Sequence, residues 1–185
     1  MGYRLALANT SVPAGNVVAN TVTKTTFADT AIVVDPNIDI NTDNGRLFSI
    51  SGYGYVSSMA SSPGTLAISI VYNNTGSVTN LGTMTFTLPT SLANAGFEID
   101  GFVLLCVAGT ATARLSCQAF GLIDNAGAPI SAAIVNTGTG TTNQVQPTNG
   151  TQGNQNMTVG LAAQFSVANA ANSITLSQLI VESKA

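Results

Sequence analysis

The sequence predicts an all-β domain, an eight-stranded antiparallel jelly-roll sandwich. Two observations lead to this fold class. Apolar side chains alternate with polar or small ones over most of residues 46–183, which is the period of a strand with one buried face. Segments rich in Gly, Pro, Asn and Asp separate these runs, and no convincing amphipathic helix interrupts them. Eight antiparallel strands favour two packed sheets, whereas the alternative, an immunoglobulin-like sandwich, has fewer strands and usually a shorter chain.

The expected strands follow the chain in order. They lie at about residues 25–34, 46–59, 65–73, 81–88, 97–108, 112–124, 156–168 and 174–183. The first two are the segments TKTTFADTAIVV and GRLFSISGYGYVSSM. The third, GTLAISIVYN, places Leu66, Ile68, Ile70 and Tyr72 on one face, and the fourth, LGTMTFTL, places Met84, Phe86 and Leu88 between threonines.

The later strands follow the same rule. In ATARLSCQAFGLID the residues of one face are Ala113, Leu115, Cys117, Ala119 and Ile123. The clearest alternation is in NMTVGLAAQFSV, with Met157, Val159, Leu161, Ala163, Phe165 and Val167 on one side. The last strand, SITLSQLIVES, begins with Ile174 and Leu176 and then changes phase to Leu179 and Val181. This change predicts a β-bulge near Ser177 and Gln178.

A long uncharged stretch, NTGTGTTNQVQPTNGTQGNQN at 136–156, separates the sixth and seventh expected strands. Only two strands follow it, too few for a second sandwich, so it is expected to be a loop within one domain. Residues 25–185 are therefore expected to form a single sandwich domain, and residues 1–24 an N-terminal segment or arm.

The segment FVLLCV, Phe102–Val107, departs from alternation because it is apolar on both faces. One face of a sandwich strand meets the core, so the other face also needs a cover. The sequence leaves two candidates for that cover, a neighbouring subunit and the segment 1–24.

Charge is scarce, at 7% of residues with a net charge of −3, and the five basic residues are scattered. Nucleic-acid binding needs clustered Lys and Arg, so no nucleic-acid partner is expected. No segment approaches the length of a membrane span or of a secretory signal core, so we expect no membrane partner and a protein made in a cytosol.

Cys106 and Cys117 lie in apolar strand patterns and are expected to be buried free thiols, with a disulfide as the alternative.

Candidate sites for chemistry are few, and no catalytic residue, cofactor or metal is expected. Asp35, Asp39 and Asp43 could place oxygen ligands around calcium, but the glycine and the twelfth position of a calcium loop do not match, and a turn explains the same residues. The chain has no histidine, the commonest general base.

Two further sets of side chains are candidates for a site. Glu98 and Asp100 alternate on one strand and could act as paired carboxylates, although a strand edge or an interface is the simpler interpretation. Stacking on a sugar would need tyrosine, because the chain has no tryptophan. The candidates are Tyr3, Tyr53, Tyr55 and Tyr72. Of these, Tyr53 and Tyr55 share a face and are the better pair.

The strand series, the uncharged loop and the closing SITLSQLIVES resemble small jelly-roll virion proteins of tailed bacteriophages, above all capsid decoration or cement proteins. The resemblance covers residues from about 20 to the end and includes no invariant motif. It implies a non-enzymatic homotrimer on the capsid exterior that binds and stabilises the major capsid protein. The expected interface residues are Phe102, Leu104, Cys106, Asn143, Gln144, Val145 and Gln146. The alternatives are a single jelly-roll major capsid protein and a tail or fibre receptor-binding module.

Overall fold

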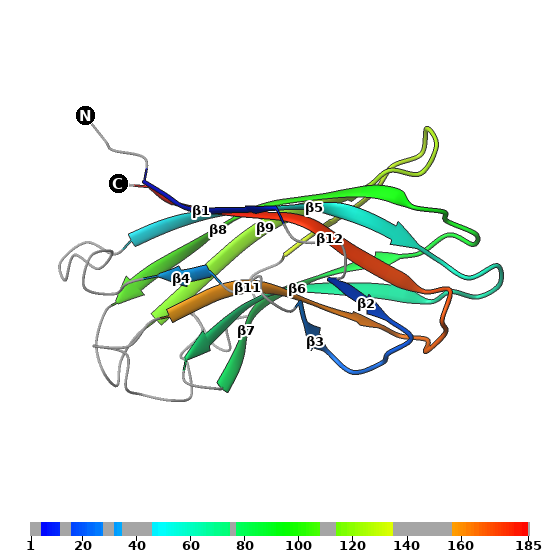
Figure 1. The fold of residues 1–185 in the computed structure, drawn as a ribbon, viewed down its shortest axis with the longest axis horizontal. Coiled ribbons are helices and arrows are strands. Elements are labelled where there is room, and N and C mark those ends of the chain that lie inside the picture. The colour runs from blue at the N-terminus through cyan, green and yellow to red at the C-terminus, as the bar shows by residue number, and fades with distance from the viewer. Residues whose placement is uncertain are drawn as a thin grey trace.

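The computed structural model describes residues 5–11, 16–27, 32–34, 46–74, 77–107, 114–134 and 157–184 of the chain. This part is all-β and forms two antiparallel sheets that lie one above the other (Figure 1). The seven-stranded sheet contains β1 (Leu5–Ser11), β2 (Val17–Ala19), β5 (Arg46–Ser57), β8 (Ala95–Val107), β9 (Arg114–Ile123), β10 (Ile130–Ala133) and β12 (Ser173–Lys184). The five-stranded sheet contains β3 (Thr25–Thr26), β4 (Ile32–Val34), β6 (Thr65–Asn74), β7 (Ser77–Thr87) and β11 (Met157–Phe165).

The strand order is that of a jelly roll. The seven-stranded sheet runs β1-β12-β5-β8-β9-β10, and β2 continues the edge that β1 forms along β12. The five-stranded sheet runs β3-β11-β6-β7, with β4 also paired to β11. If β1 and β2 count as one interrupted strand, β3 and β4 as another, and β9–β10 as an insertion, the two sheets read 1-8-3-6 and 2-7-4-5. This interleaving of the two ends of the chain is the double Greek key of a jelly roll, so the predicted fold class is confirmed.

The strand count differs from the expected eight because the structure describes twelve. The expected strand at 25–34 is two short strands, β3 and β4, and three more strands, β1, β2 and β10, were not expected. Both β1 and β2 come from the segment 1–24 and form an edge of the larger sheet. The predicted bulge is confirmed, since the register of β12 against β5 shifts between Leu176 and Gln178.

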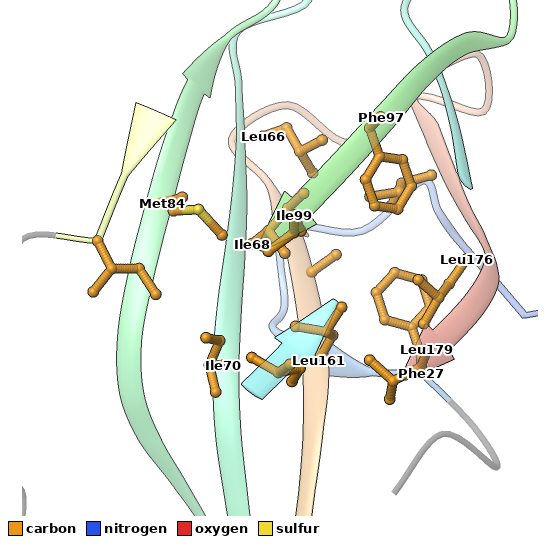
Figure 2. Packing of buried hydrophobic residues seen from close by; sticks show 14 of the residues in the cluster. Phe27, Leu66, Ile68, Ile70, Met84, Phe97, Ile99, Leu161, Leu176 and Leu179 are labelled. Atoms are coloured by element: carbon orange, nitrogen blue, oxygen red, sulfur yellow. The ribbon is translucent and has the colours of Figure 1, made fainter. Parts of the chain in front are cut away.

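The core lies between the sheets and is filled by the alternating residues that the sequence indicated. Leu66, Ile68 and Ile70 of β6 meet Ile99 of β8 and Leu176 of β12 in this layer (Figure 2). The alternation is not complete, however. The opposite face of the five-stranded sheet also contains buried residues, namely Ser69, Val71 and Ala162.

The β9–β10 hairpin connects the two sheets on one side. It belongs to the seven-stranded sheet, but both its strands also contact β7 of the other sheet. The N–H of Ile134 donates to the carbonyl of Ala119 at 2.8 Å, which extends the pairing beyond β10. Gly82 of β7 allows this close approach, because a Cβ there would overlap the Ile134 side chain and lie 3.0 Å from Cys117 Sγ.

No helix occurs in the described part of the chain, and so none there is long and apolar enough to cross a membrane. Residues 88–94, between β7 and β8, form a turn.

Candidate functional site

The outer face of the seven-stranded sheet, opposite the core, carries exposed apolar side chains. Phe102 of β8 is 49% exposed, Phe120 of β9 is 53% exposed and Leu104 of β8 is 37% exposed. Leu47 of β5 is partly exposed and pairs across the strands with Leu104. These four residues, Leu47, Phe102, Leu104 and Phe120, are called the apolar patch below. They share one face because Phe102 and Leu104 alternate with the buried Gly101 and Val103.

Two adjoining hollows lie in this face. The larger one has a volume of about 660 Å³, and the smaller one about 280 Å³. The described residues that line the larger hollow are Asp100, Gly101, Phe102, Gln118, Ala119, Phe120 and Ile134. Those that line the smaller hollow are Leu47, Phe102, Leu104, Ser116, Cys117 and Gln118. Phe102 and Gln118 line both hollows and are cross-strand neighbours, so the two hollows form one continuous depression.

Tyrosines and carboxylates lie next to the apolar patch on the same face. We call Tyr53, Tyr55, Glu98 and Asp100 the tyrosine–carboxylate strip. Tyr53 of β5 pairs with Glu98 of β8, and Ser51 Oγ donates to Asp100 Oδ1 at 2.6 Å. Partial burial, together with the negative charges of Asp100 and Glu98, raises the pKa of Tyr53. Tyr53 therefore stays protonated and neutral at physiological pH.

Tyr55 of this strip is 52% exposed. Its cross-strand partner is Gly96, and a Cβ built on Gly96 would meet nothing within 4 Å. One flank of the Tyr55 ring is thus bordered by a residue without a side chain.

A third hollow, of about 370 Å³, lies at the end of the sandwich between the β7–β8 and β9–β10 turns. Polar side chains, Ser91, Asn94, Asp124 and Asn125, account for much of its lining. Within the described residues, no group of three or more Cys, Asp or Glu side chains could hold a metal ion.

The structure describes the side chains of only some of the site residues predicted from the sequence. Phe102 and Leu104 lie together on the outer face, as the interface prediction requires. Cys106 belongs to β8, but its side chain lies outside the described residues, as do Asn143, Gln144, Val145 and Gln146. The calcium candidates Asp35, Asp39 and Asp43 and the tyrosine Tyr3 also lie outside them.

The structure describes three of the tyrosines, the carboxylate pair and one of the cysteines. Tyr53 and Tyr55 do share an exposed face, whereas Tyr72 is fully buried, and burial raises its pKa to about 12. Glu98 and Asp100 share the outer face, but β8 is an interior strand, so the strand-edge interpretation of this pair was wrong. Cys117 is a buried free thiol, as expected.

Phe120 and Leu47 were missed as surface residues. In LSCQAFGLI the buried residues are Cys117, Gly121 and Ile123, so the even-numbered Phe120 falls on the outward face. The sequence alone could have indicated this exposed residue, because a large apolar side chain stands at a position that points away from the core. Phe120 pairs across the strands with Asp100 of β8.

The fold and this face together define a jelly-roll β-sandwich protein with an apolar depression on its larger sheet. No protein-family model matches the chain. No curated protein matches it either. Among solved structures, the chain is similar to the CBM2 module of the evolved Dit protein of Lactobacillus casei BL23 phage J-1, at a TM-score of 0.38 and 9% identity. That match covers 99% of this chain and 97% of the other.

Proposed function

We propose that this chain is a non-enzymatic virion structural protein of a tailed bacteriophage, an outer capsid decoration or cement protein. Its work is binding: it attaches to the major capsid protein from outside and stabilises the shell. The single observation that carries the proposal is the apolar patch on the outer face of a jelly-roll sandwich. A soluble protein that works alone rarely leaves such a stripe of Phe and Leu side chains in water.

The composition supports a binding role rather than a catalytic one. The chain has few charges, and its polar surface consists of Ser, Thr, Asn, Gln and Gly, which suits contact with other protein. Its five basic residues are scattered in the sequence, which favours an outer position over contact with packaged DNA. The sequence resemblance to decoration proteins adds the expectation of a homotrimer.

The chemistry of the described side chains fits the same proposal. The thiol of Cys117 is buried, and its pKa is raised to about 12 by that burial, so it is not a nucleophile at neutral pH. Ser51 Oγ donates a hydrogen bond to Asp100 Oδ1, and the chain has no histidine, the commonest general base. We accordingly propose no catalytic residue and no cofactor.

The test is the position of the protein in virions that contain it. Cryo-electron microscopy is expected to show the sandwich on the outside of the shell, at sites between neighbouring capsid subunits. Purified protein added to shells that lack it is expected to bind them and to raise the temperature at which they break. Particles formed by this protein alone would instead support a single jelly-roll major capsid protein and would overturn the decoration role.

The second candidate is a receptor-binding module of the tail or fibre, and the tyrosine–carboxylate strip favours it. The exposed Tyr55 ring, with Gly96 beside it, offers a platform for a sugar ring, and Glu98 can accept hydrogen bonds from hydroxyl groups. A glycan array on which wild-type protein binds and Tyr55→Ser does not, with antibody labelling at the tail, would favour this candidate over decoration.

A further inference from the structure

We infer that the hollow at the end of the sandwich, beside Tyr55, binds one uncharged pyranose unit of a glycan. This hollow is called the end hollow below, and its lining includes Asn94, Gly96 and Asp124. The inference names the ligand class for the second candidate function and rests on that candidate for its biological role. Sugar binding itself can be measured on the protein alone, without shells or cells.

A row of outward positions places an aromatic ring and a carboxylate on either side of a residue without a side chain. Tyr55 of β5 pairs with Gly96 of β8, and the N–H of Asp124, just after β9, donates to the Gly96 carbonyl at 2.8 Å. A Cβ built on Gly96 would meet nothing within 4 Å. Because neighbouring strands lie about 4.8 Å apart, the backbones of Tyr55 and Asp124 are separated by about 10 Å. The space over Gly96 is therefore an open slot between them.

The width of this slot suits one sugar ring. A sugar that stacks on the Tyr55 ring places its carbons about 3.5–4.0 Å from the ring carbons. A hydroxyl that donates to the Asp124 carboxylate lies about 2.5–3.0 Å from the accepting oxygen. These two contacts take up about 6–7 Å of a width of about 10 Å, so a single ring fits between them. The adjoining end hollow, of about 370 Å³, leaves space for substituents of that ring.

The end hollow also presents a donor and an acceptor that have no partner among the described residues. Ser57 Oγ donates to Asn94 Oδ1 at 3.4 Å and accepts from the Asn94 N–H at 3.1 Å. The side-chain oxygen of Asn94 is thus used, and its amide nitrogen is left to donate. The carboxylate of Asp124 accepts no hydrogen bond from a described residue. Adjacent sugar hydroxyls can accept from such an amide and donate to such a carboxylate.

Charge selects the class of sugar. Asp124 lines the end hollow, and Glu98 is the next outward residue after Gly96 on β8, so two carboxylates lie at or beside the slot. No Lys or Arg is among the described residues that line the end hollow. The carboxylate of a sialic or uronic acid would therefore meet negative charge without a described basic partner. An uncharged hexose or N-acetylhexosamine meets no such repulsion.

The sharpest variant is Gly96→Val, which fills the slot and leaves every hydrogen-bonding side chain in place. The φ angle of Gly96 is not positive and the space around its Cβ position is open, so valine suits this strand position. Ser49→Val is the matched control, because it adds the same side chain to the same face of β5, about 20 Å along the strand from Tyr55. Tyr55→Ser and Asp124→Ala each remove one exposed contact group.

Amide NMR spectra of the full-length protein measure binding as sugars are added. The uncharged probes are the methyl glycosides of glucose, galactose, mannose, N-acetylglucosamine and N-acetylgalactosamine, and the anionic probes are N-acetylneuraminic acid and glucuronic acid. We expect at least one uncharged glycoside to give saturable shifts at the amides of Gly96 and Asp124. Titration to about 50 mM covers millimolar dissociation constants, and the anionic sugars are expected to give no saturable shift in that range.

Gly96→Val, Tyr55→Ser and Asp124→Ala are each expected to weaken this binding at least tenfold, and Ser49→Val to leave it unchanged. A wild-type protein that shows no saturable shift with any uncharged glycoside would overturn the inference. So would binding that Gly96→Val leaves intact, or anionic sugars that bind more tightly than uncharged ones. Thermal unfolding checks the fold of each variant. If Gly96→Val lowers the midpoint, the two exposed-residue variants decide the outcome.

This inference and the decoration role fail in different ways. A protein that binds shells but none of the sugars would retain the decoration role and refute the sugar site. A protein that binds a sugar in the slot but does not bind shells would retain this inference and favour the receptor-binding module. Gly96→Val protein that binds shells as tightly as the wild type would show that the two surfaces are separate.

Discussion

The side-chain oxygen of Asn172 accepts a hydrogen bond from the backbone N–H of Met59 at 2.9 Å, across 113 positions of sequence. The amide nitrogen of Asn172 donates to the carbonyls of Pro63 at 3.2 Å and Val167 at 3.1 Å. Asn172 is completely buried. One side chain thus joins the segment between β5 and β6 to the turn between β11 and β12, and all its hydrogen-bonding groups have partners within the protein.

Replacing Asn172 by alanine is therefore expected to destabilise the fold strongly. One buried and two partly buried backbone hydrogen bonds would be lost, and a loss of about 3 kcal/mol in the free energy of unfolding is expected at about 1–3 kcal/mol for each buried group left unsatisfied. Urea denaturation measures it. Asn169→Ala is the matched control, because the Asn169 side chain bonds only locally, to the N–H of Ala171 in an exposed turn. Equal losses in the two variants would contradict the role given to Asn172.

Substitution by alanine is expected to change the stability of the fold by very different amounts at two glycines, Gly54 and Gly96. A Cβ on Gly54 would overlap the carbonyl oxygen of Thr175 and lie 2.6 Å from Phe97 Cε1, so Gly54→Ala forces adjacent strands apart. We expect a loss of about 3 kcal/mol, at the upper end for overpacking. Gly96→Ala meets nothing within 4 Å and is expected to change the thermal midpoint only slightly. Similar midpoints for both variants would show that the packing around Gly54 is looser than described.

The buried thiol of Cys117 makes stability depend on alkaline pH. Burial raises its pKa from 9.0 to about 12, so the folded state holds the proton more tightly than the unfolded chain does. This contribution is complete below pH 9 and is lost as the pH rises towards 12. Cys117→Ala is expected to flatten the fall in unfolding free energy between pH 9 and 11, measured in urea. The fall should persist in part, because Tyr72 also has a raised pKa of about 12.

Chelation of calcium is expected to leave the fold intact. The acidic residues Asp35, Asp39 and Asp43 do not match the charge and spacing of a high-affinity calcium loop. A thermal scan with and without a chelator should therefore show the same midpoint. A fall of more than about 5 °C, equivalent to about 1 kcal/mol or more, would show that a bound cation stabilises the fold.

The sequence was sufficient for the fold class because local alternation records which face of each long strand meets the core. The bulge in β12 was predictable for the same reason, since the apolar phase changes between Leu176 and Leu179. The first strand was not predictable in this way. β1 is a short edge strand whose pairing partner β12 lies at the other end of the chain, as in the pair Leu5–Ser183. Nothing within LALANTS encodes that pairing.

Alternation also gave an incomplete account of exposure. Ser69 and Val71 occupy the positions of β6 that a two-layer sandwich leaves to solvent, yet both are buried. Phe102 and Leu104 occupy such positions in β8 and are exposed. Period two distinguishes the two faces of a strand, but the cover of the second face depends on contacts between distant elements or between chains. The apolar patch could therefore be placed on a face from the sequence, whereas its depression and Phe120 required the structure.

The jelly-roll strand order also has a consequence for timing. β12 lies between β1 and β5, and β11 lies between β4 and β6, so the last two strands that the structure describes fill interior positions of both sheets. A ribosome adds about 5–20 residues per second, and until Met157–Lys184 emerge neither sheet can be completed. During that interval the edges of β5 and β6 that later receive β12 and β11 cannot be paired as in the finished sheets. We expect the sandwich to close only after β12 has left the ribosome, slowly and through long-range contacts, so the incomplete sheets are exposed to chaperones until then.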